Sequence, residues 1–193
     1  VLLYIFDVAI LSVFPFLFSL FCIFFFRNPK RAPLVTGSEL ISPADGKVLE
    51  IKDIEEDEFV GGISKRVSIF MSPMDVHVNR SPCKGRIVKV VHKPGEFALA
   101  FKKDIDKENE RNYILIQKGE ERVLLVQIAG FLARRIISYV KEGDLVERGD
   151  AVGMIAFGSR VDIYIPQIYE PMIQLNTKVK AGVTPLAKRR EPE

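Results

Sequence analysis

The chain has 193 residues, which is enough for one domain of ordinary size and an appendage. Hydrophobic residues make up 48% and charged residues 27%, a composition typical of a globular protein. The net charge of +3 is too small to indicate a nucleic-acid partner, and no basic and aromatic stripe supports one. Cys22 and Cys83 are placed too differently to suggest a disulfide, which fits a reducing compartment. With only two histidines and no cysteine cluster, we expect no metal cofactor.

The first predicted element is an apolar helix near the N-terminus. No charged residue occurs from Val8 to Phe26, and nineteen residues at about 1.5 Å each nearly span a hydrocarbon core of about 30 Å. Basic residues follow directly, at Arg27, Lys30 and Arg31. We therefore predict a membrane anchor over residues 1–27, as one tilted helix or a tight hairpin broken near Pro15. The basic flank predicts a cell-membrane location with the following domain on the cytoplasmic face.

Two alternatives for this apolar segment are weaker. A buried core helix of this length would be unusual without a polar face. A signal peptide carries its positive charges before the apolar run, and here they come after it.

Residues 28–38 form a polar, proline-containing connector, and residues 39–193 form the predicted main domain. This domain consists of short apolar runs, several of them rich in β-branched residues, separated by Gly, Pro, Asp and Asn. A short helix is also expected near Ala98–Lys103. The candidate strands are Lys47–Ile54, Ser64–Met71, Arg86–His92, Asn112–Gln117, Arg122–Ala129, Arg135–Val140, Ala151–Ala156 and Val161–Ile165. The pattern predicts an all-β fold, either a sandwich or a flattened barrel.

Residues Gly143–Gly153 follow the pattern Gly-Asp-x-Val-x-x-Gly-Asp-x-Val-Gly. This pattern is similar to the turns of biotinyl/lipoyl-type domains, in which glycines form tight corners and valines point inward. It allows a second interpretation, a membrane-anchored adaptor or carrier module without catalysis. A carrier needs a lysine at the tip of a hairpin, and this stretch contains none.

The dipeptide Gly158-Ser159 carries the most specific chemistry. The serine hydroxyl can attack the preceding carbonyl carbon and convert the amide into an ester. Elimination then leaves dehydroalanine, which hydrolyses to a pyruvoyl group at a new chain start. Alone, a Gly-Ser pair more often marks a turn.

Several further stretches accompany this dipeptide in a fixed order. They are Phe26–Pro29, Ser42–Gly46, Phe70–Pro82, Asn109–Asn112, Ile128–Ile136 and Phe157–Val161. Together, over nearly the whole chain, they resemble the phosphatidylserine decarboxylase family in its short form.

The resemblance implies a self-processing, pyruvoyl-dependent lyase of phospholipid biosynthesis. The zymogen would cleave itself between Gly158 and Ser159 into residues 1–158 and 159–193, which stay associated. The amine of phosphatidylserine would form a Schiff base with the pyruvoyl group derived from Ser159, lose CO₂ and leave as phosphatidylethanolamine. The expected partners are phosphatidylserine and membrane lipid. A diacyl or ether lipid backbone, and a monomer or a homodimer, remain open.

The base that activates Ser159 is not fixed by the sequence. Asp45 matches the aspartate of the family's Pro-x-Asp-Gly motif, although an Asp-Gly pair also commonly caps a turn. His77 matches the first of two family histidines, and Arg80 stands where the second is found. His77 is therefore a candidate for the base or for the proton donor in decarboxylation, with a structural histidine as the alternative. Asp45, His77 or another group remain open as the base.

Four arginines are candidates for substrate binding, because guanidinium groups bind phosphodiesters and carboxylates. They are Arg111, Arg134, Arg135 and Arg160. Each could instead pair with neighbouring acidic residues. Arg160 lies next to the scission site, but a tight carboxylate clamp would oppose the loss of CO₂.

Overall fold

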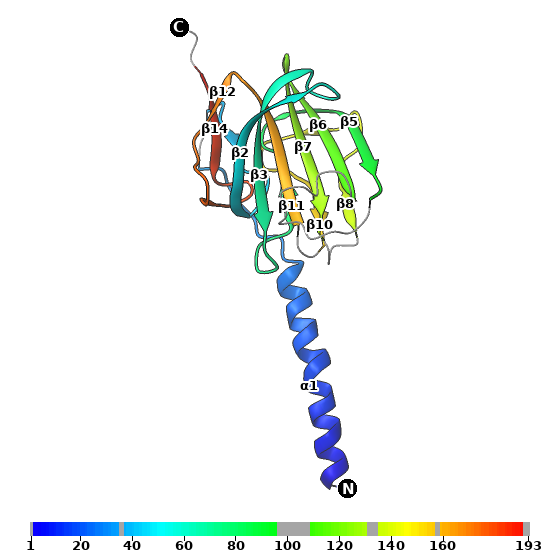
Figure 1. Cartoon of the computed structure of the whole chain (residues 1–193). Coiled ribbons are helices and arrows are strands. Elements are labelled where there is room, and N and C mark those ends of the chain that lie inside the picture. Colours follow the sequence, from blue (N-terminus) through cyan, green and yellow to red (C-terminus); the bar gives the residue numbers. More distant parts are fainter. Residues whose placement is uncertain (1, 35–36, 96–108, 131–134, 157–158, 191–193) are drawn as a thin grey trace.

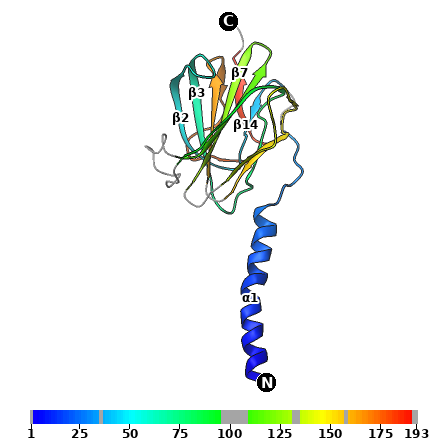
Figure 2. The same ribbon diagram turned by 90° about the vertical axis from the view of Figure 1, so that its right-hand side faces the viewer.

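The computed structural model describes residues 2–34, 37–95, 109–130, 135–156 and 159–190, with side chains from residue 11 onward. One helix, α1 (Leu2–Phe25), precedes a domain built from strands (Figure 1). The helix projects away from the strands in both views (Figures 1 and 2). The chain is mostly β, which confirms the predicted all-β class.

Helix α1 is continuous through Pro15, so the alternative of a hairpin broken at that residue is wrong. Pro15 lacks the N–H that an interior helical residue donates, and the Ser19 hydroxyl donates to the Pro15 carbonyl at 2.8 Å. From residue 11 the apolar side chains are largely exposed, as at Leu11 and Phe14. Within the described residues no helix has the length and apolar character needed to cross a membrane. The predicted helix is confirmed, and its membrane-spanning role finds no support.

Fourteen strands occur in the described residues. They are β1 (Leu40–Ile41), β2 (Gly46–Glu56), β3 (Gly62–Met71), β4 (Val78–Arg80), β5 (Gly85–Lys93), β6 (Arg111–Lys118), β7 (Glu121–Ala129), β8 (Ile136–Ser138), β9 (Leu145–Val146), β10 (Ala151–Ile155), β11 (Ser159–Pro166), β12 (Tyr169–Pro171), β13 (Lys178–Val179) and β14 (Pro185–Arg189). The largest sheet has the order β13-β2-β3-β11-β7-β6-β5-β9, and two three-stranded sheets have the orders β1-β14-β12 and β4-β10-β8.

All eight predicted strands are present, with ends that shift by a few residues. The six strands that sequence patterns did not indicate are β1, β4, β9, β12, β13 and β14, each of two to five residues. Such short strands show too little alternation to be recognised, and their pairing depends on distant partners. The helix expected near Ala98–Lys103 lies outside the described residues.

The large sheet buries apolar residues on both faces. One face contributes to the main core, with residues such as Val67, Ile69 and Ile163 fully buried. The other face carries a smaller cluster around Phe59, whose ring stacks on Tyr113 at a centroid distance of 4.9 Å. Burial on both faces explains why β7 reads as a continuous apolar run rather than an alternating one.

One end of this sheet gathers most of the predicted site residues that the structure describes. Strands β3 and β7 end there, and β2, β6 and β11 begin there, because all neighbouring pairs are antiparallel. In Figure 1 the arrowheads of β3 and β7 point toward α1 at this end. We call it the site end and the opposite one the hairpin end.

Candidate active site

Ser159 is the first residue of β11, the strand between β3 and β7. It lies opposite Met71 on one side and Ala129 on the other, and its side chain is fully buried. Its hydroxyl donates to the Met71 sulfur at 3.4 Å. A thioether is a weak acceptor, so this contact leaves the hydroxyl available for reaction.

Asp45 precedes β2, and its position depends on the glycine that follows it. Gly46 has φ +148°, a backbone conformation that favours glycine. A Cβ at Gly46 would also lie 2.0 Å from the Phe70 carbonyl oxygen of β3. The close approach of β3 therefore requires glycine at position 46, and Asp45 lies just before β2, the strand that pairs with β3.

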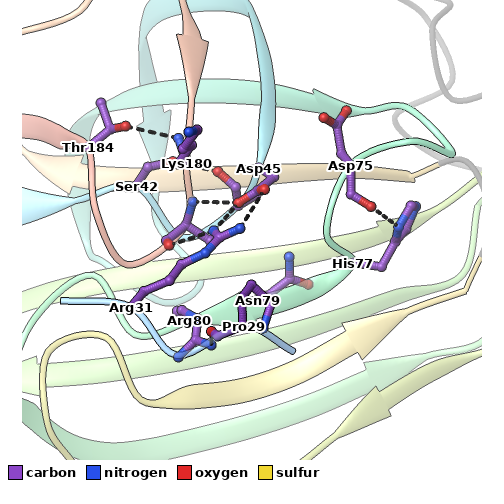
Figure 3. Close-up of polar contacts among 12 residues, drawn as sticks. Pro29, Arg31, Ser42, Asp45, Asp75, His77, Asn79, Arg80, Lys180 and Thr184 are labelled. Carbon is purple, nitrogen blue, oxygen red and sulfur yellow. Dashed lines mark hydrogen bonds and ion pairs between the residues drawn. The ribbon is translucent and has the colours of Figure 1, made fainter. Parts of the chain in front are cut away.

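Both oxygens of the Asp45 carboxylate accept hydrogen bonds. Arg31 binds both of its oxygens, with Nη2 2.8 Å from Oδ2, and the Ala181 N–H donates to Oδ1 at 2.8 Å. The two charged side chains are each only 11% exposed. Arg31 also donates to the Ala181 carbonyl at 2.9 Å. The connector therefore ties Asp45 to the turn before β14 (Figure 3).

His77 precedes β4 and is fully buried. Its Nδ1 lies 3.0 Å from the Asp75 carbonyl oxygen, which can only accept, so we assign the ring proton to Nδ1 (Figure 3). Nε2 is buried and has no hydrogen-bond partner among the described residues. Burial lowers the pKa of His77 from its ordinary 6.5, so the ring is neutral at neutral pH. Nε2 is thus a buried proton acceptor with an unused lone pair.

The last turn of α1 and the connector pack directly on these residues. The Phe25 ring is fully buried and lies 4.1 Å from the His77 ring, centroid to centroid. Arg80 donates to the Asn28 side chain at 2.5 Å and to the Pro29 carbonyl at 3.0 Å. Arg80, in the place of a second histidine, therefore anchors the connector and does not contact Ser159 by any described hydrogen bond.

A chain of buried amide side chains lies beside Ser159. Asn112 donates to Gln127 at 2.9 Å, and Gln127 donates to Asn79 at 2.8 Å. Asn79 in turn donates to the Met71 sulfur at 3.5 Å, the same atom that accepts from Ser159. These hydrogen bonds fix the position of the Met71 side chain, whose sulfur also accepts from the Ser159 hydroxyl.

Arg160 points away from Ser159, because successive residues of a strand face opposite sides of the sheet. Its Nη2 lies 2.9 Å from the Asp162 carboxylate, in a pair whose side chains are 9% and 2% exposed. Burial raises the pKa of Asp162, an effect that the guanidinium of Arg160 opposes. This pairing corresponds to the structural alternative for Arg160 rather than to a substrate contact.

Two of the other three predicted arginines, Arg111 and Arg135, lie within the described residues. Arg111 begins β6, and its Nη1 contacts the Tyr113 hydroxyl at 3.4 Å, while Nε and Nη2 are buried without a described partner. Arg135 is exposed, and its carbonyl accepts from the Ala156 N–H at 3.2 Å. Arg134 and Gly158 lie outside the described residues.

The structure thus brings Ser159, Asp45, His77 and Arg111 to one end of the sheet. No hydrogen bond joins Ser159 to Asp45 or His77 among the described residues. Sequence reasoning did not find Phe25 and Arg31 as site contacts. The sequence did hold a signal for them. The Phe26–Pro29 stretch, which lies between these two residues, is part of the family resemblance, but no role was assigned to it.

No cluster of three or more His, Cys, Asp or Glu able to hold a metal ion occurs in the described ranges. The described groups at this end of the sheet include a buried serine, a neutral histidine and charged pairs.

Comparisons with known proteins identify the class of enzyme. The family model for phosphatidylserine decarboxylase matches residues 18–187. The phosphatidylserine decarboxylase proenzyme of Carboxydothermus hydrogenoformans is 44% identical over 92% of this chain and 84% of its own length. The proenzyme of Syntrophus aciditrophicus is 40% identical over 91% of this chain and 83% of its own length. That of Chlorobium luteolum is 43% identical, with shares of 87% and 79%.

The chain is therefore an enzyme, a carboxy-lyase. It belongs to the phosphatidylserine decarboxylase family.

Proposed function

We propose that the chain converts phosphatidylserine to phosphatidylethanolamine with a pyruvoyl group made from Ser159 by self-cleavage after Gly158. The observation that carries the proposal is the buried Nε2 of His77, which has no partner among the described residues and lies at the same sheet end as the weakly bonded Ser159 hydroxyl. The relatives' description as proenzymes supports processing. No observation favours the adaptor or carrier alternative.

Self-cleavage begins at Ser159. Oγ loses its proton and bonds to the Gly158 carbonyl carbon, while the carbon–nitrogen bond between the two residues breaks and the nitrogen gains a proton. Removal of the Ser159 Cα proton then breaks the bond from Cβ to the ester oxygen and expels Gly158 as a carboxylate. Water replaces the resulting enamine nitrogen, which leaves as ammonia, and a ketone remains.

His77 is the proposed acceptor of the Ser159 proton. A serine hydroxyl is a poor nucleophile without a base, and a neutral imidazole supplies one near neutral pH. The Asp75 carbonyl holds the proton on Nδ1, which keeps the Nε2 lone pair available. The Phe25 ring and the surrounding burial exclude water from the imidazole.

Asp45 has a different proposed role. Both of its carboxylate oxygens are already bonded, by Arg31 and by the Ala181 N–H, and no described hydrogen bond joins it to Ser159. We assign to Asp45 the task of holding the connector and the turn before β14 against the site end.

The residues around Ser159 fit the pyruvoyl group. Ser159 is buried at a strand start between apolar neighbours, so a ketone there would be shielded from water. The group supplies an electron-withdrawing carbonyl that accepts the negative charge left when CO₂ departs. His77 can return a proton to the product carbon. Arg111, whose buried Nε and Nη2 have no partner among the described residues, can bind an anionic part of the substrate.

The mass of the purified full-length chain under denaturing conditions tests self-cleavage. We expect two species that correspond to residues 1–158 and 159–193. Ser159→Ala is expected to stay as one inactive chain, with loss of all measurable decarboxylation. A wild-type chain that persists at full length on incubation would contradict the proposal. Two fragments from Ser159→Ala would indicate cleavage by another protease.

Substitution of each of the two histidines in turn tests the base, with His92 as the control for His77. We expect His77→Asn to slow self-cleavage by about a hundredfold, the lower range for general base catalysis. His92 is half-exposed and contacts Glu110 at 3.2 Å, and His92→Asn should cleave at the wild-type rate. Normal cleavage by His77→Asn would remove His77 from this step.

The proposed location is the cytoplasmic face of the cell membrane. The exposed apolar side chains of α1, such as Phe14 and Ile23, would contact lipid, and Arg27 at the end of the helix would meet anionic headgroups. Flotation with lipid vesicles measures this contact. A full-length chain that stays at the bottom of the gradient would contradict the proposed location.

A further inference from the structure

A cavity of about 420 Å³ lies between the connector and the turn before β10, and we call it the connector cavity. Four basic side chains line it, Lys30 and Arg31 from the connector, Arg80 from β4 and Arg148 from the turn. Asp150 is the only carboxylate among the described residues of its wall. Such an excess of positive charge in a concave surface favours an anionic ligand.

Arg80 is a buried charge whose protein partners are all neutral. It is only 9% exposed, and it donates to the Gly149 carbonyl at 2.7 Å and to the oxygens of Asn28 and Pro29. Its Nε is buried and has no hydrogen-bond partner among the described residues. Burying a charge is costly unless an opposite charge accompanies it. Arg80 therefore lacks the counter-ion that a buried guanidinium normally has.

The charges around Arg80 do not supply this counter-ion. Burial and the nearby guanidinium of Arg31 lower the pKa of Arg80, while Asp45 and Asp150 oppose the change (Figure 3). Asp45 already binds Arg31, and the exposed Asp150 accepts from the Glu147 N–H at 2.7 Å. An anion in the connector cavity would offset the repulsion between the two guanidinium groups.

The lining side chains suit a phosphate group. Guanidinium groups present a planar fork to phosphate oxygens, and a lysine adds a mobile point charge. Lys30 is exposed and makes no hydrogen bond or ion pair with any residue that the structure describes. Arg31 fixes the connector through Asp45 and the Ala181 carbonyl, so the site is largely formed before a ligand binds and loses less entropy.

The connector cavity is separate from the candidate active site. Asn79 points toward the Met71 sulfur, the atom that also accepts from Ser159. Arg80 is the next residue of β4, and successive residues of a strand point to opposite faces. The ligand of Arg80 is therefore not the headgroup that reacts at Ser159.

The connector cavity lies close to the end of α1. Asn28, in its wall, follows the last helical residue Phe25 by three positions, which a chain spans in at most about 10 Å. The neighbouring side chains of Phe24 and Phe26 are exposed and apolar. If these rings contact lipid, as the proposed location requires, the cavity lies at the level of the phosphate groups of the bilayer.

We propose that the connector cavity binds a phosphate group, presented by an anionic phospholipid of the bilayer surface or by a soluble phosphate. Lys30, Arg31, Arg80 and Arg148 supply the positive charge. This inference goes beyond the proposed function, and the binding does not depend on the pyruvoyl chemistry. Bound phospholipid would tie the connector, and with it the strand domain, to the membrane surface at a second point beside the helix.

The test measures anion binding by calorimetry to the full chain in a nonionic detergent at constant ionic strength. The two probes are inorganic phosphate and dihexanoyl phosphatidylglycerol, which has no amine and cannot form a Schiff base. We expect saturable binding, with a dissociation constant about tenfold higher in Lys30→Gln, because one charge-assisted contact is lost. Lys30→Arg should restore most of the affinity. Lys52→Gln, an exposed lysine on β2, is the matched control and should bind as wild type does.

A second variant addresses the possibility that Lys30 alone contributes little. Lys30→Gln with Arg148→Gln removes two of the four positive charges, while Arg80 stays because it holds the connector. We expect a larger loss of affinity than in Lys30→Gln. A dissociation constant unchanged in both variants, or no saturable binding of either probe to the wild type, would overturn the proposal.

The two probes distinguish the source of the phosphate. Tighter binding of phosphatidylglycerol than of inorganic phosphate, weakened by Lys30→Gln, would identify a lipid headgroup. Equal binding of both probes would retain the phosphate site and assign it to a soluble phosphate. The cavity residues all precede Ser159, so a chain that fails to cleave itself would refute the proposed function without changing these results.

Discussion

The two ends of the large sheet differ in the exposure of their polar side chains. At the hairpin end, charged residues meet at the surface, as in the Lys65–Asp53 pair, in which Asp53 is 60% exposed. At the site end, Asp45, His77 and Gln127 are buried, and each is held by a specific partner. Water can replace a lost partner at the first end but not at the second. Substitutions at the site end should therefore have much larger effects than matched changes at the hairpin end.

The largest effect is expected from Arg31→Ala. It leaves the Asp45 carboxylate buried without its cation, and breaking a buried pair typically lowers the free energy of unfolding by about 3–5 kcal/mol. Urea unfolding of the uncleaved Ser159→Ala chain, with and without Arg31→Ala, measures this loss in a single polypeptide. Arg31→Lys keeps the charge but loses the two-point contact. Its free energy of unfolding should therefore lie between that of the Ser159→Ala background and that of the same chain with Arg31→Ala. A loss under about 1 kcal/mol would mean that the connector pair is as weak as a surface pair.

A smaller effect is expected from acid. Because burial lowers the pKa of His77 in the folded state, the unfolded chain binds a proton first as pH falls. The contribution of neutral His77 to stability is therefore fully present above the ordinary pKa of 6.5 and declines as pH drops below it. Thermal unfolding from pH 7.5 to pH 5 should show a steeper fall for wild type than for His77→Asn. Parallel curves would contradict a buried neutral histidine.

The smallest effect is expected at the hairpin end. Lys65→Ala removes the partner of the exposed Asp53, and solvent replaces the interaction. The change in the free energy of unfolding should be under about 0.5 kcal/mol, with no change in self-cleavage. A loss comparable to that of Arg31→Ala would remove the distinction between the two ends.

Local patterns were sufficient for the long strands and for the helix. The β-branched run Arg86–His92 is a strand in the structure, as its composition predicts, and the uncharged segment of Phe, Leu and Ile is a continuous helix. Continuity through Pro15 was not predictable, because proline can either end a helix or be accommodated in one. The short strands β13 and β14 were also not predicted. Two to five residues show no clear periodicity, and these strands depend on pairing with β2 and β1.

The site was predictable where chemistry is carried by residue type, and less so where it depends on contacts. Ser159, Asp45 and His77 stand out by motif. The pairing of Arg31 with Asp45 joins residues far enough apart that only the folded connector brings them together. The facing of Arg160 toward Asp162 follows from strand alternation once Ser159 is known to begin β11. The pairing of Lys178 with Lys47 depends on β13, a short strand that no sequence pattern revealed.

The position of Ser159 at the start of β11 has a consequence for the processed enzyme. Cleavage before Ser159 would place β11, β12, β13 and β14 on the shorter fragment. β11 is hydrogen-bonded to β3 and β7 on its two sides, β13 pairs with β2, and β14 pairs with β1. The short fragment would thus be hydrogen-bonded to strands of the long fragment through β11, β13 and β14. Maturation would turn one chain into a heterodimer without moving a strand, and separating the halves would require unfolding both.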